Sequence, residues 1–382
     1  MRIVYCIDYL FGVGGIERVT ITKANALANI EGNNIWIICL NNEMPVFPID
    51  EKVHIVSLDI NYHDHDWEMS RFQQLINIWQ KKKEHRRKMK EILLLINPDI
   101  VVSTGGLEKS FLHSFSRKFP FVCIRESHFV SNYRLLGTDT FYSKILNGIN
   151  YLLDRYYYIH RYNITVVLTN EDKERFWKTD NKVVVIPNPV TSSHTQHSML
   201  TNNTVIAAGR LAKQKNFSSL LRSWKIVHQK HADWILEIWG DGTERNHLEQ
   251  MTVELQLQGS ARIMGVTDYV FSKMAQASVF VLSSLYEGLP LVVLEAMSCG
   301  LPVVSYACPC GPKDIITEGK DGYLVPTGDE ERLAEKICFL IEHEDIRREM
   351  GKAAVEKSKQ YALEPIIRQW MTLFHELTAK KQ

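Results

Sequence analysis

The chain has 382 residues, of which 45% are hydrophobic, and its 45 Lys and Arg against 44 Asp and Glu give a formal charge of +1. This length predicts two folded domains, and the balanced charge excludes a protein that binds nucleic acid through its overall charge. The sequence has no run of about 18 apolar residues and no long apolar core near its N-terminus, so we expect neither a membrane span nor a signal peptide.

Seven cysteines are scattered along the chain, mostly inside aliphatic runs that are typical of strands. This odd, dispersed set indicates reduced thiols and a cytoplasmic protein. Cys308 and Cys310 are the one close pair. Since no second Cys or His pair follows at zinc-finger spacing, they predict a turn rather than a metal site.

Short β-branched runs alternate with helical stretches along the whole chain. In the first half such runs begin at Arg2, Asn34, Val53, Asp99, Phe121, Ile164 and Lys182, and in the second half at Thr204, Trp234, Ala261, Ser278, Pro302 and Tyr323. The alternation predicts an α/β protein with two doubly wound, Rossmann-like domains. Residues 187–203, rich in Pro, Ser, Thr and Asn, predict the linker. We therefore bound the domains at 1–188 and 189–362, followed by a C-terminal helix at 363–382.

A glycine-rich turn follows the first predicted strand. Gly12, Gly14 and Gly15 would let backbone N–H groups approach an anion at the start of the next helix. The spacing is not G-x-G-x-x-G, because Glu17 stands in place of the third glycine, and this disfavours a dinucleotide-dependent dehydrogenase. A tight turn without a ligand explains the glycines equally well.

The turn after the first strand of the second half carries two cations. Arg210 and Lys215 precede a helix that starts near Asn216, where the helix N-terminus already favours anions. We expect this pair to bind phosphate, although two solvated surface cations would give the same pattern.

Two glutamates stand eight positions apart in the stretch YEGLPLVVLEAMSCG. Glu287 should lie in the loop after a strand, Pro290 suits the first turn of the next helix, and Glu295 lies about one turn into that helix. Both carboxylates could accept hydrogen bonds from hydroxyls of one ligand, with the amides of Gly288 and Leu289 facing phosphates between them. The alternative is an exposed Glu before a helix and an incidental Glu within it.

Residues 283–337 resemble the signature of the family-four retaining glycosyltransferases of the GT-B fold. Residues 12–19 (GVGGIERV), 207–216 (AAGRLAKQKN) and 238–249 (IWGDGTERNHLE) resemble other motifs of that family, in the expected order. The resemblance implies two Rossmann-like domains that face a cleft, with the C-terminal helix packing back on the N-terminal domain.

The resemblance also implies roles for the site residues. Glu287 would contact the donor-sugar hydroxyls and Glu295 the ribose diol, while Arg210 and Lys215 bind the diphosphate and the turn Gly14–Gly15 closes over it. Cations and helix amides stabilise the negative charge that develops on a leaving diphosphate, so we expect no metal or other cofactor. Retention of configuration is implied by the family alone.

The family places a histidine after a strand of the N-terminal domain. In CIRESHFV, Glu126 stands in that register and His128 follows two positions later, so we predict both as catalytic helpers beside Glu287. The alternative is that Arg125, Glu126 and His128 are solvated loop residues.

Asp64 and Asp66, in YHDHDW, match the metal-binding D-x-D of another glycosyltransferase fold. This chain predicts two α/β domains, which is twice the architecture that the other fold needs. We therefore interpret the stretch as a polar loop near the acceptor rather than a metal site.

From Phe72 the sequence predicts a helix with an apolar stripe of Phe72, Leu75, Ile76 and Trp79, followed by ten residues with seven cations. Residues 72–90 could lie on an anionic membrane surface, or form a charged face packed on the sheet. Because the family often extends lipid-linked glycans, we expect peripheral association with the inner face of the cytoplasmic membrane.

The leading functional hypothesis is a hexosyltransferase that moves a hexose or N-acetylhexosamine from a UDP-linked donor onto a glycan or lipid-linked oligosaccharide, for surface polysaccharide such as lipopolysaccharide or capsule. A UDP-sugar 2-epimerase shares the two-domain architecture and would need no acceptor. A third alternative is a non-catalytic subunit that binds nucleotide sugar.

Overall fold

The structure is a computed structural model that describes residues 1–12, 14–62, 70–116, 119–129, 131–132, 141–177, 181–190 and 197–380. The chain divides into two compact units. Unit 1 comprises residues 1–167, 177–186 and 366–382, and unit 2 comprises 168–176 and 187–365. Asp64 and Asp66, and residues 191–196 of the predicted linker, lie outside the described residues.

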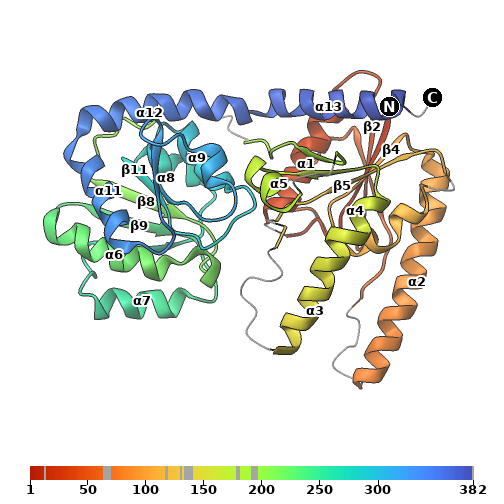
Figure 1. Ribbon diagram of the computed structural model, residues 1–382, viewed down its shortest axis with the longest axis horizontal. Coiled ribbons are helices and arrows are strands. Elements are labelled where there is room, and N and C mark those ends of the chain that lie inside the picture. The colour runs from red at the N-terminus through yellow and green to blue at the C-terminus, as the bar shows by residue number, and fades with distance from the viewer. Residues whose placement is uncertain are drawn as a thin grey trace. The chain divides into compact units, whose positions relative to one another are not determined.

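Unit 1 is built on a parallel sheet (Figure 1). Its described strands are β1 (Arg2–Cys6), β2 (Asn34–Cys39), β3 (Val53–Ser57), β4 (Ile100–Ser103), β5 (Val122–Glu126), β6 (Ile164–Val167) and β7 (Val183–Val185), in the order β3-β2-β1-β4-β5-β6-β7. The strand order reverses direction between β1 and β4. Ligands of open parallel sheets bind at such a switch point, beyond the carboxyl ends of the strands.

The helices of unit 1 cover both faces of this sheet. They are α1 (Gly15–Ala28), α2 (Arg71–Ile96), the 3₁₀ turns η2 (Leu107–Ser110) and η3 (Leu112–Ser114), α3 (Phe141–Leu152), the π-helical segment η5 (Leu153–Tyr158), α4 (Ile159–Arg161) and α13 (Leu363–Ala379). The connections β3–α2–β4 and β5–α3–β6 run in the direction opposite to β1–α1–β2. Since such crossovers are right-handed, α2 and α3 lie on one face and α1 on the other.

Alternating residues of the strands fill the two layers beside the sheet. Val4 and Cys6 pack with Met89 and Leu93 of α2. On the other face, Lys23 of α1 lies over the rings of Tyr5 and of Trp370 of α13. The C-terminal helix thus packs on unit 1, as predicted.

Unit 2 repeats the architecture with strands β8 (Thr204–Ala208), β9 (Ile235–Trp239), β10 (Ala261–Gly265), β11 (Val279–Leu282), β12 (Val303–Tyr306) and β13 (Gly322–Val325), in the order β10-β9-β8-β11-β12-β13. Its helices are α5 (Asn170–Phe176), η6 (Lys213–Lys215), α6 (Phe217–Lys230), α7 (Arg245–Glu254), α8 (Val270–Ala275), α9 (Leu291–Ser298), α10 (Pro312–Ile315), α11 (Glu330–Glu342), α12 (Glu344–Ser358) and η7 (Lys359–Tyr361). The switch point lies between β8 and β11. The predicted α/β class and doubly wound topology are confirmed in both units.

All seven cysteines are buried, and none forms a disulfide. Within the described residues, no group of three or more His, Cys, Asp or Glu side chains is placed to hold a metal ion. No helix in the same part of the chain is both long enough and apolar enough to cross a membrane.

Candidate functional site

Two of the predicted donor-binding residues of unit 2, Lys215 and Glu287, lie in two loops at the switch point. The turn after β8 carries Lys215 at the end of η6, and the loop after β11 carries Glu287. The two loops are joined, because Leu285 N–H donates to the Gln214 carbonyl at 2.8 Å and the Gln214 side chain donates to the Tyr286 carbonyl at 2.8 Å. The separate motifs therefore form one structural unit.

Lys215 and Glu287 form an ion pair at the centre of this unit. Lys215 Nζ lies 2.6 Å from Glu287 Oε1, and Ser284 Oγ donates to the same oxygen at 2.6 Å. The backbone of Glu287 is held by the Cys308–Cys310 turn, since Glu287 N–H donates to the Pro309 carbonyl at 2.9 Å. Glu287 is 7% exposed, so the alternative of a solvated Glu before a helix is wrong.

Close contacts between backbones explain two glycines of the motif IWGDGTERNHLE. A Cβ atom on Gly240 would lie 1.9 Å from the Gly209 carbonyl oxygen, and one on Gly242 would lie 2.4 Å from the Leu211 carbonyl oxygen. Both glycines also have positive φ angles, of 141° and 156°. Side chains at these positions would separate the turn after β9 from the turn that carries Lys215.

The other donor-side candidates of unit 2 differ in how far they are buried. Glu295 is the fifth residue of α9 and is 5% exposed, and Leu289 is 8% exposed in the loop before it, next to Gly288. The Arg210 side chain is exposed, and no acidic side chain of the described residues pairs with it. Arg210 is thus available to a ligand in a way that Lys215 is not.

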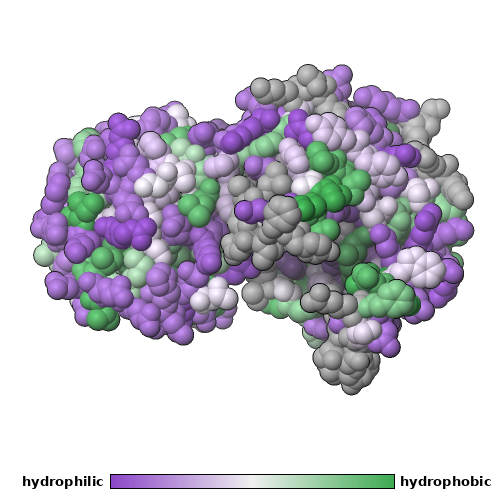
Figure 2. All heavy atoms as spheres, turned by 60° about the horizontal axis from the view of Figure 1, so that its bottom comes forward, coloured by the Kyte–Doolittle hydropathy of each residue, from purple (hydrophilic) through white to green (hydrophobic). Residues whose placement is uncertain are grey.

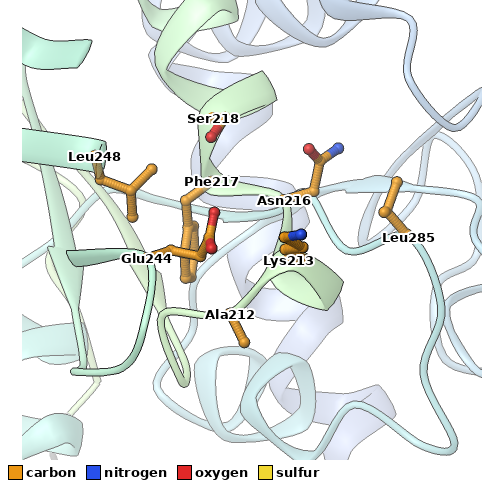
Figure 3. Close-up of a pocket in the computed structure, with 8 residues that line it drawn as sticks. All are labelled: Ala212, Lys213, Asn216, Phe217, Ser218, Glu244, Leu248 and Leu285. Carbon is orange, nitrogen blue, oxygen red and sulfur yellow. The ribbon is translucent and has the colours of Figure 1, made fainter. Parts of the chain in front are cut away.

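A cavity of about 230 Å³ opens beside this turn, at the N-terminus of α6 (Figure 3). Lys213, Asn216, Ser218 and Glu244 supply its polar lining. None of the predicted donor-binding residues lines this cavity, although Lys213 and Leu285, which do, belong to the loops that carry Lys215 and Glu287.

In unit 1, Gly14 caps the N-terminus of α1 and Gly15 is its first residue. A Cβ atom on Gly14 would lie 2.4 Å from Glu17 Oε2, so the glycine makes room for the carboxylate that folds back over the turn. A negative charge at this end of a helix is favourable.

A second cavity, of about 260 Å³, lies at the carboxyl ends of β1, β4 and β5. Glu126 and His128 both line it, and so do Arg125 and Asp154. Asp154 Oδ1 lies 2.8 Å from Lys109 Nζ and 3.2 Å from Arg125 Nη2. Arg125, Glu126 and His128 are 7%, 0% and 9% exposed, so the alternative of solvated loop residues is wrong.

Glu126 and His128 differ in their ion pairing and in their pKa shifts. The Glu126 carboxylate forms a fully buried ion pair with Lys23. Burial raises the pKa of Glu126, but Lys23 and then His128 oppose it, and the pKa ends below its ordinary value. Burial lowers the pKa of His128 to about 4, against the effect of Glu126, which lies 3.7 Å away. His128 is therefore neutral at physiological pH.

Two acidic residues of this cavity's surroundings were missed in the sequence. Asp8, which follows β1, accepts a hydrogen bond from Leu107 N–H at 3.0 Å, and Glu108 accepts one from Ser103 Oγ at 2.5 Å. A Cβ atom on Gly106 would lie within 2.6 Å of both carboxyl groups, so they crowd around this glycine. Both residues stand at the switch point, and that rule applied to β1 and β4 would have found them.

Burial raises the pKa of Asp8, and burial together with the charge of Asp8 raises the pKa of Glu108 to about 8. Because the folded state binds this proton more tightly, the stabilisation is complete below about pH 4.5 and is lost as the pH rises through about 8.

We expect Glu108→Gln to remove this pH dependence while keeping the hydrogen bond to Ser103. The free energy of unfolding of the unsubstituted protein should fall by up to about 1.4 kcal/mol per pH unit more steeply than that of the variant between about pH 5 and pH 8. Urea denaturation at three pH values measures the two slopes. Parallel slopes would contradict the raised pKa.

The comparisons with known proteins agree on one family. The sequence model described as "Glycosyl transferases group 1" matches residues 192–357. An uncharacterized glycosyltransferase of Haemophilus influenzae is 28% identical, over 97% of this chain and 98% of that protein. The amylovoran biosynthesis glycosyltransferase AmsD of Erwinia amylovora is 27% identical, over 97% and 98%. The uncharacterized glycosyltransferase MJ1059 of Methanocaldococcus jannaschii is 31% identical, over 61% and 67%.

Solved structures show the same fold. The lipopolysaccharide outer core galactosyltransferase WaaB, in its apo form, superposes with a TM-score of 0.74 at 17% identity, over 98% of this chain and 99% of that one. Anabaena HepE in complex with UDP and glucose gives a TM-score of 0.73 at 15% identity, over 98% and 100%. The chain therefore belongs to the group 1 glycosyl transferases, as an enzyme of the GT-B fold that is related to glycosyltransferases of polysaccharide biosynthesis.

Proposed function

We propose that this enzyme transfers a hexose or N-acetylhexosamine from a UDP-sugar to a glycan or lipid-linked oligosaccharide, with retention of configuration and without a metal ion. The observation that carries the proposal is the Lys215–Glu287 pair, fixed by Ser284 at the switch point of unit 2. It places a cation beside a carboxylate at the edge of the sheet where ligands bind. The cation would face the negative diphosphate of a nucleotide sugar, and the carboxylate would face the sugar carbon that becomes positive.

The transfer needs charge stabilisation on both sides of the bond that breaks. When the bond between the anomeric carbon and the diphosphate oxygen breaks, the electron pair goes to the diphosphate, and the carbon becomes positive. We assign Lys215 and Arg210 to the diphosphate and the Glu287 carboxylate to the sugar. The acceptor oxygen then bonds to the anomeric carbon and gives up its proton.

His128 is our candidate for receiving that proton. Its imidazole is neutral, and neither ring nitrogen has a hydrogen-bond partner among the described residues. Glu126 is already bound by Lys23, which supports a role in holding His128 in place rather than contacting substrate. The cavity that both residues line is our candidate acceptor site.

The names of similar proteins support the choice of substrates. HepE binds UDP and glucose in its solved structure, and AmsD and WaaB take part in making amylovoran and lipopolysaccharide. We place the reaction at the inner face of the cytoplasmic membrane, where lipid-linked acceptors are extended.

Arg210→Ala is expected to weaken UDP binding by about tenfold to a hundredfold, because a hydrogen-bonded charge is lost from the diphosphate. Thermal shift with UDP measures this, since ligand binding raises the melting temperature by mass action. Arg262→Ala, an exposed arginine on β10, is the matched control. If UDP raised the melting temperature of both variants equally, Arg210 would not be part of the UDP-binding site.

A panel of nucleotide sugars with and without glycan acceptors tests the whole proposal. We expect transfer that needs an acceptor and survives a chelator. Release of free sugar and nucleotide without any acceptor would instead indicate an epimerase-like reaction.

A further inference from the structure

The first half of α2 extends beyond the packed part of unit 1. Ser70 and Gln73 form a capping box that starts the helix. No residue from 72 to 84 is buried, and burial on this helix begins at His85. The large apolar residues on these turns remain exposed: Phe72 (71%), Leu75 (65%), Ile76 (42%), Ile78 (39%) and Trp79 (65%). The alternative of a face packed on the sheet is therefore wrong for these turns.

A second exposed apolar stripe runs along α3 and η5. Ile145, Ile149, Leu152 and Tyr156 follow one another at spacings of four, three and four residues, and they are 47%, 50%, 52% and 63% exposed. This spacing places them on one side of the helix. A helix of this kind ordinarily buries such a stripe, and here the described residues leave it open.

The two stripes belong to helices on the same side of unit 1. Both helices cover one face of the sheet, with η2 and η3 between them: Arg86 of α2 donates to Ser114 Oγ at 3.2 Å, and the ring of His113 lies 6.0 Å from that of Tyr157. Both start beyond the carboxyl edge of the sheet, where the unit 1 cavity opens. Figure 1 shows α2 and α3 projecting in the same direction from unit 1, and in Figure 2 hydrophobic side chains gather on the face of unit 1 that is turned forward.

A band of positive charge follows the apolar turns of α2. It consists of Lys81, Lys82, Lys83, Arg86, Arg87, Lys88 and Lys90. Among the described residues, acidic side chains pair only with Arg87 and Lys88 of this band. Lys83 Nζ lies 5.8 Å from the Trp79 ring centroid, so cation and aromatic ring adjoin at the boundary.

We infer that α2 and the α3–η5 stripe together dock unit 1 on an anionic lipid bilayer. Apolar side chains would enter the headgroup region, Trp79 and Tyr156 would lie at its boundary, and the lysines would meet the lipid phosphates. Charge complementarity selects this occupant, since neither a second copy of this chain, which carries the same positive band, nor a neutral surface would complement it. Docking in this orientation brings the carboxyl edge of the sheet, and the cavity there, close to the headgroups.

This arrangement makes the acceptor a lipid-linked saccharide, a step that rests on the function proposed above. The docking itself does not depend on that function.

Cosedimentation with liposomes tests the inference. We expect the full chain to bind phosphatidylglycerol-containing liposomes at low salt, to bind phosphatidylcholine liposomes much more weakly, and to dissociate as salt screens the charges. Lys81→Gln/Lys82→Gln/Lys83→Gln should weaken the binding about a hundredfold. Lys320→Gln/Lys352→Gln, which changes two exposed lysines of unit 2, should leave it unchanged.

The apolar part has its own pair of variants. Leu75→Ser/Trp79→Ser and Ile149→Ser/Tyr156→Ser should each weaken liposome binding at least about tenfold, because each removes two side chains from the bilayer. Val266→Ser/Tyr269→Ser, which changes residues of unit 2 that are 76% and 73% exposed, is the matched control.

Three outcomes would overturn the inference: no sedimentation at low salt, equal binding by the apolar variants and their control, or self-association of the chain that Trp79→Ser abolishes. Thermal shift with UDP on the same samples separates the two proposals. Liposome binding without UDP binding would contradict the proposed function and support the docking surface. UDP binding without liposome binding would contradict the docking surface and leave the proposed function supported.

Discussion

Replacing Glu287 by Gln is expected to lower the rate of sugar transfer by about 10²–10³-fold while UDP binding stays within a few fold. Gln fills the same volume and can still accept the hydrogen bond from Ser284, so the loop between β11 and α9 should keep its shape. What it removes is the negative charge that we assign to the sugar in the transition state. Initial rates at saturating donor, together with UDP titration, measure the two effects.

The control for this variant is Glu331→Gln, an exposed glutamate at the start of α11. Turnover that is unchanged in Glu287→Gln would remove the residue from the reaction. A parallel loss of UDP binding would show instead that Glu287 acts by positioning Lys215.

Lys23→Met should destabilise unit 1 by about 3–5 kcal/mol, which is the effect expected when one partner of a buried ion pair is removed. Lys23 and Glu126 are both 0% exposed, so the remaining carboxylate would have no water around it. The loss should reach α13 as well, because Lys23 Nζ lies 4.7 Å from the ring centroid of Trp370. Urea denaturation monitored by tryptophan fluorescence measures it.

The double variant Lys23→Met/Glu126→Leu is the informative comparison. Replacing both charges of a buried pair by apolar side chains is often close to neutral, so most of the lost stability should return. A double variant as unstable as Lys23→Met alone would mean that packing, and not an unpaired charge, causes the loss.

The strands and their parallel pairing could be predicted from the sequence because buried parallel strands leave near-continuous aliphatic runs. The runs that begin at Arg2 and Thr204 are examples, and both became the strands at the switch points, β1 and β8. The position of Glu287 in a loop could also be predicted, because a strand, a glycine-proline turn and a helix follow one another directly in the sequence. These features depend on neighbours within about ten residues of each other in the chain.

The contacts that hold the site together could not be predicted in this way. Lys215 and Glu287 are 72 residues apart, and Lys23 and Glu126 are 103 apart on different elements. Their meeting depends on strand order, which places β8 beside β11, and places β5, the strand that ends at Glu126, next to β4 and one strand away from β1. The exposure of the apolar stripe on α3 could not be predicted, for a related reason. Its spacing is that of any amphipathic helix, and only the packed structure shows whether the core covers it.

Because every cysteine is buried, the rate at which the thiols react measures how often each unit unfolds locally. Alkylating reagents attack the thiolate, and burial raises the pKa of Cys39 and Cys299 to about 11, so the folded chain should react slowly at neutral pH. Cys6, Cys39 and Cys123 would report on unit 1, and the remaining four on unit 2. Counting modified thiols by mass spectrometry during mild denaturation would show which half loosens first. One cysteine introduced on the surface would then take up a fluorophore selectively, with the natural seven left in place.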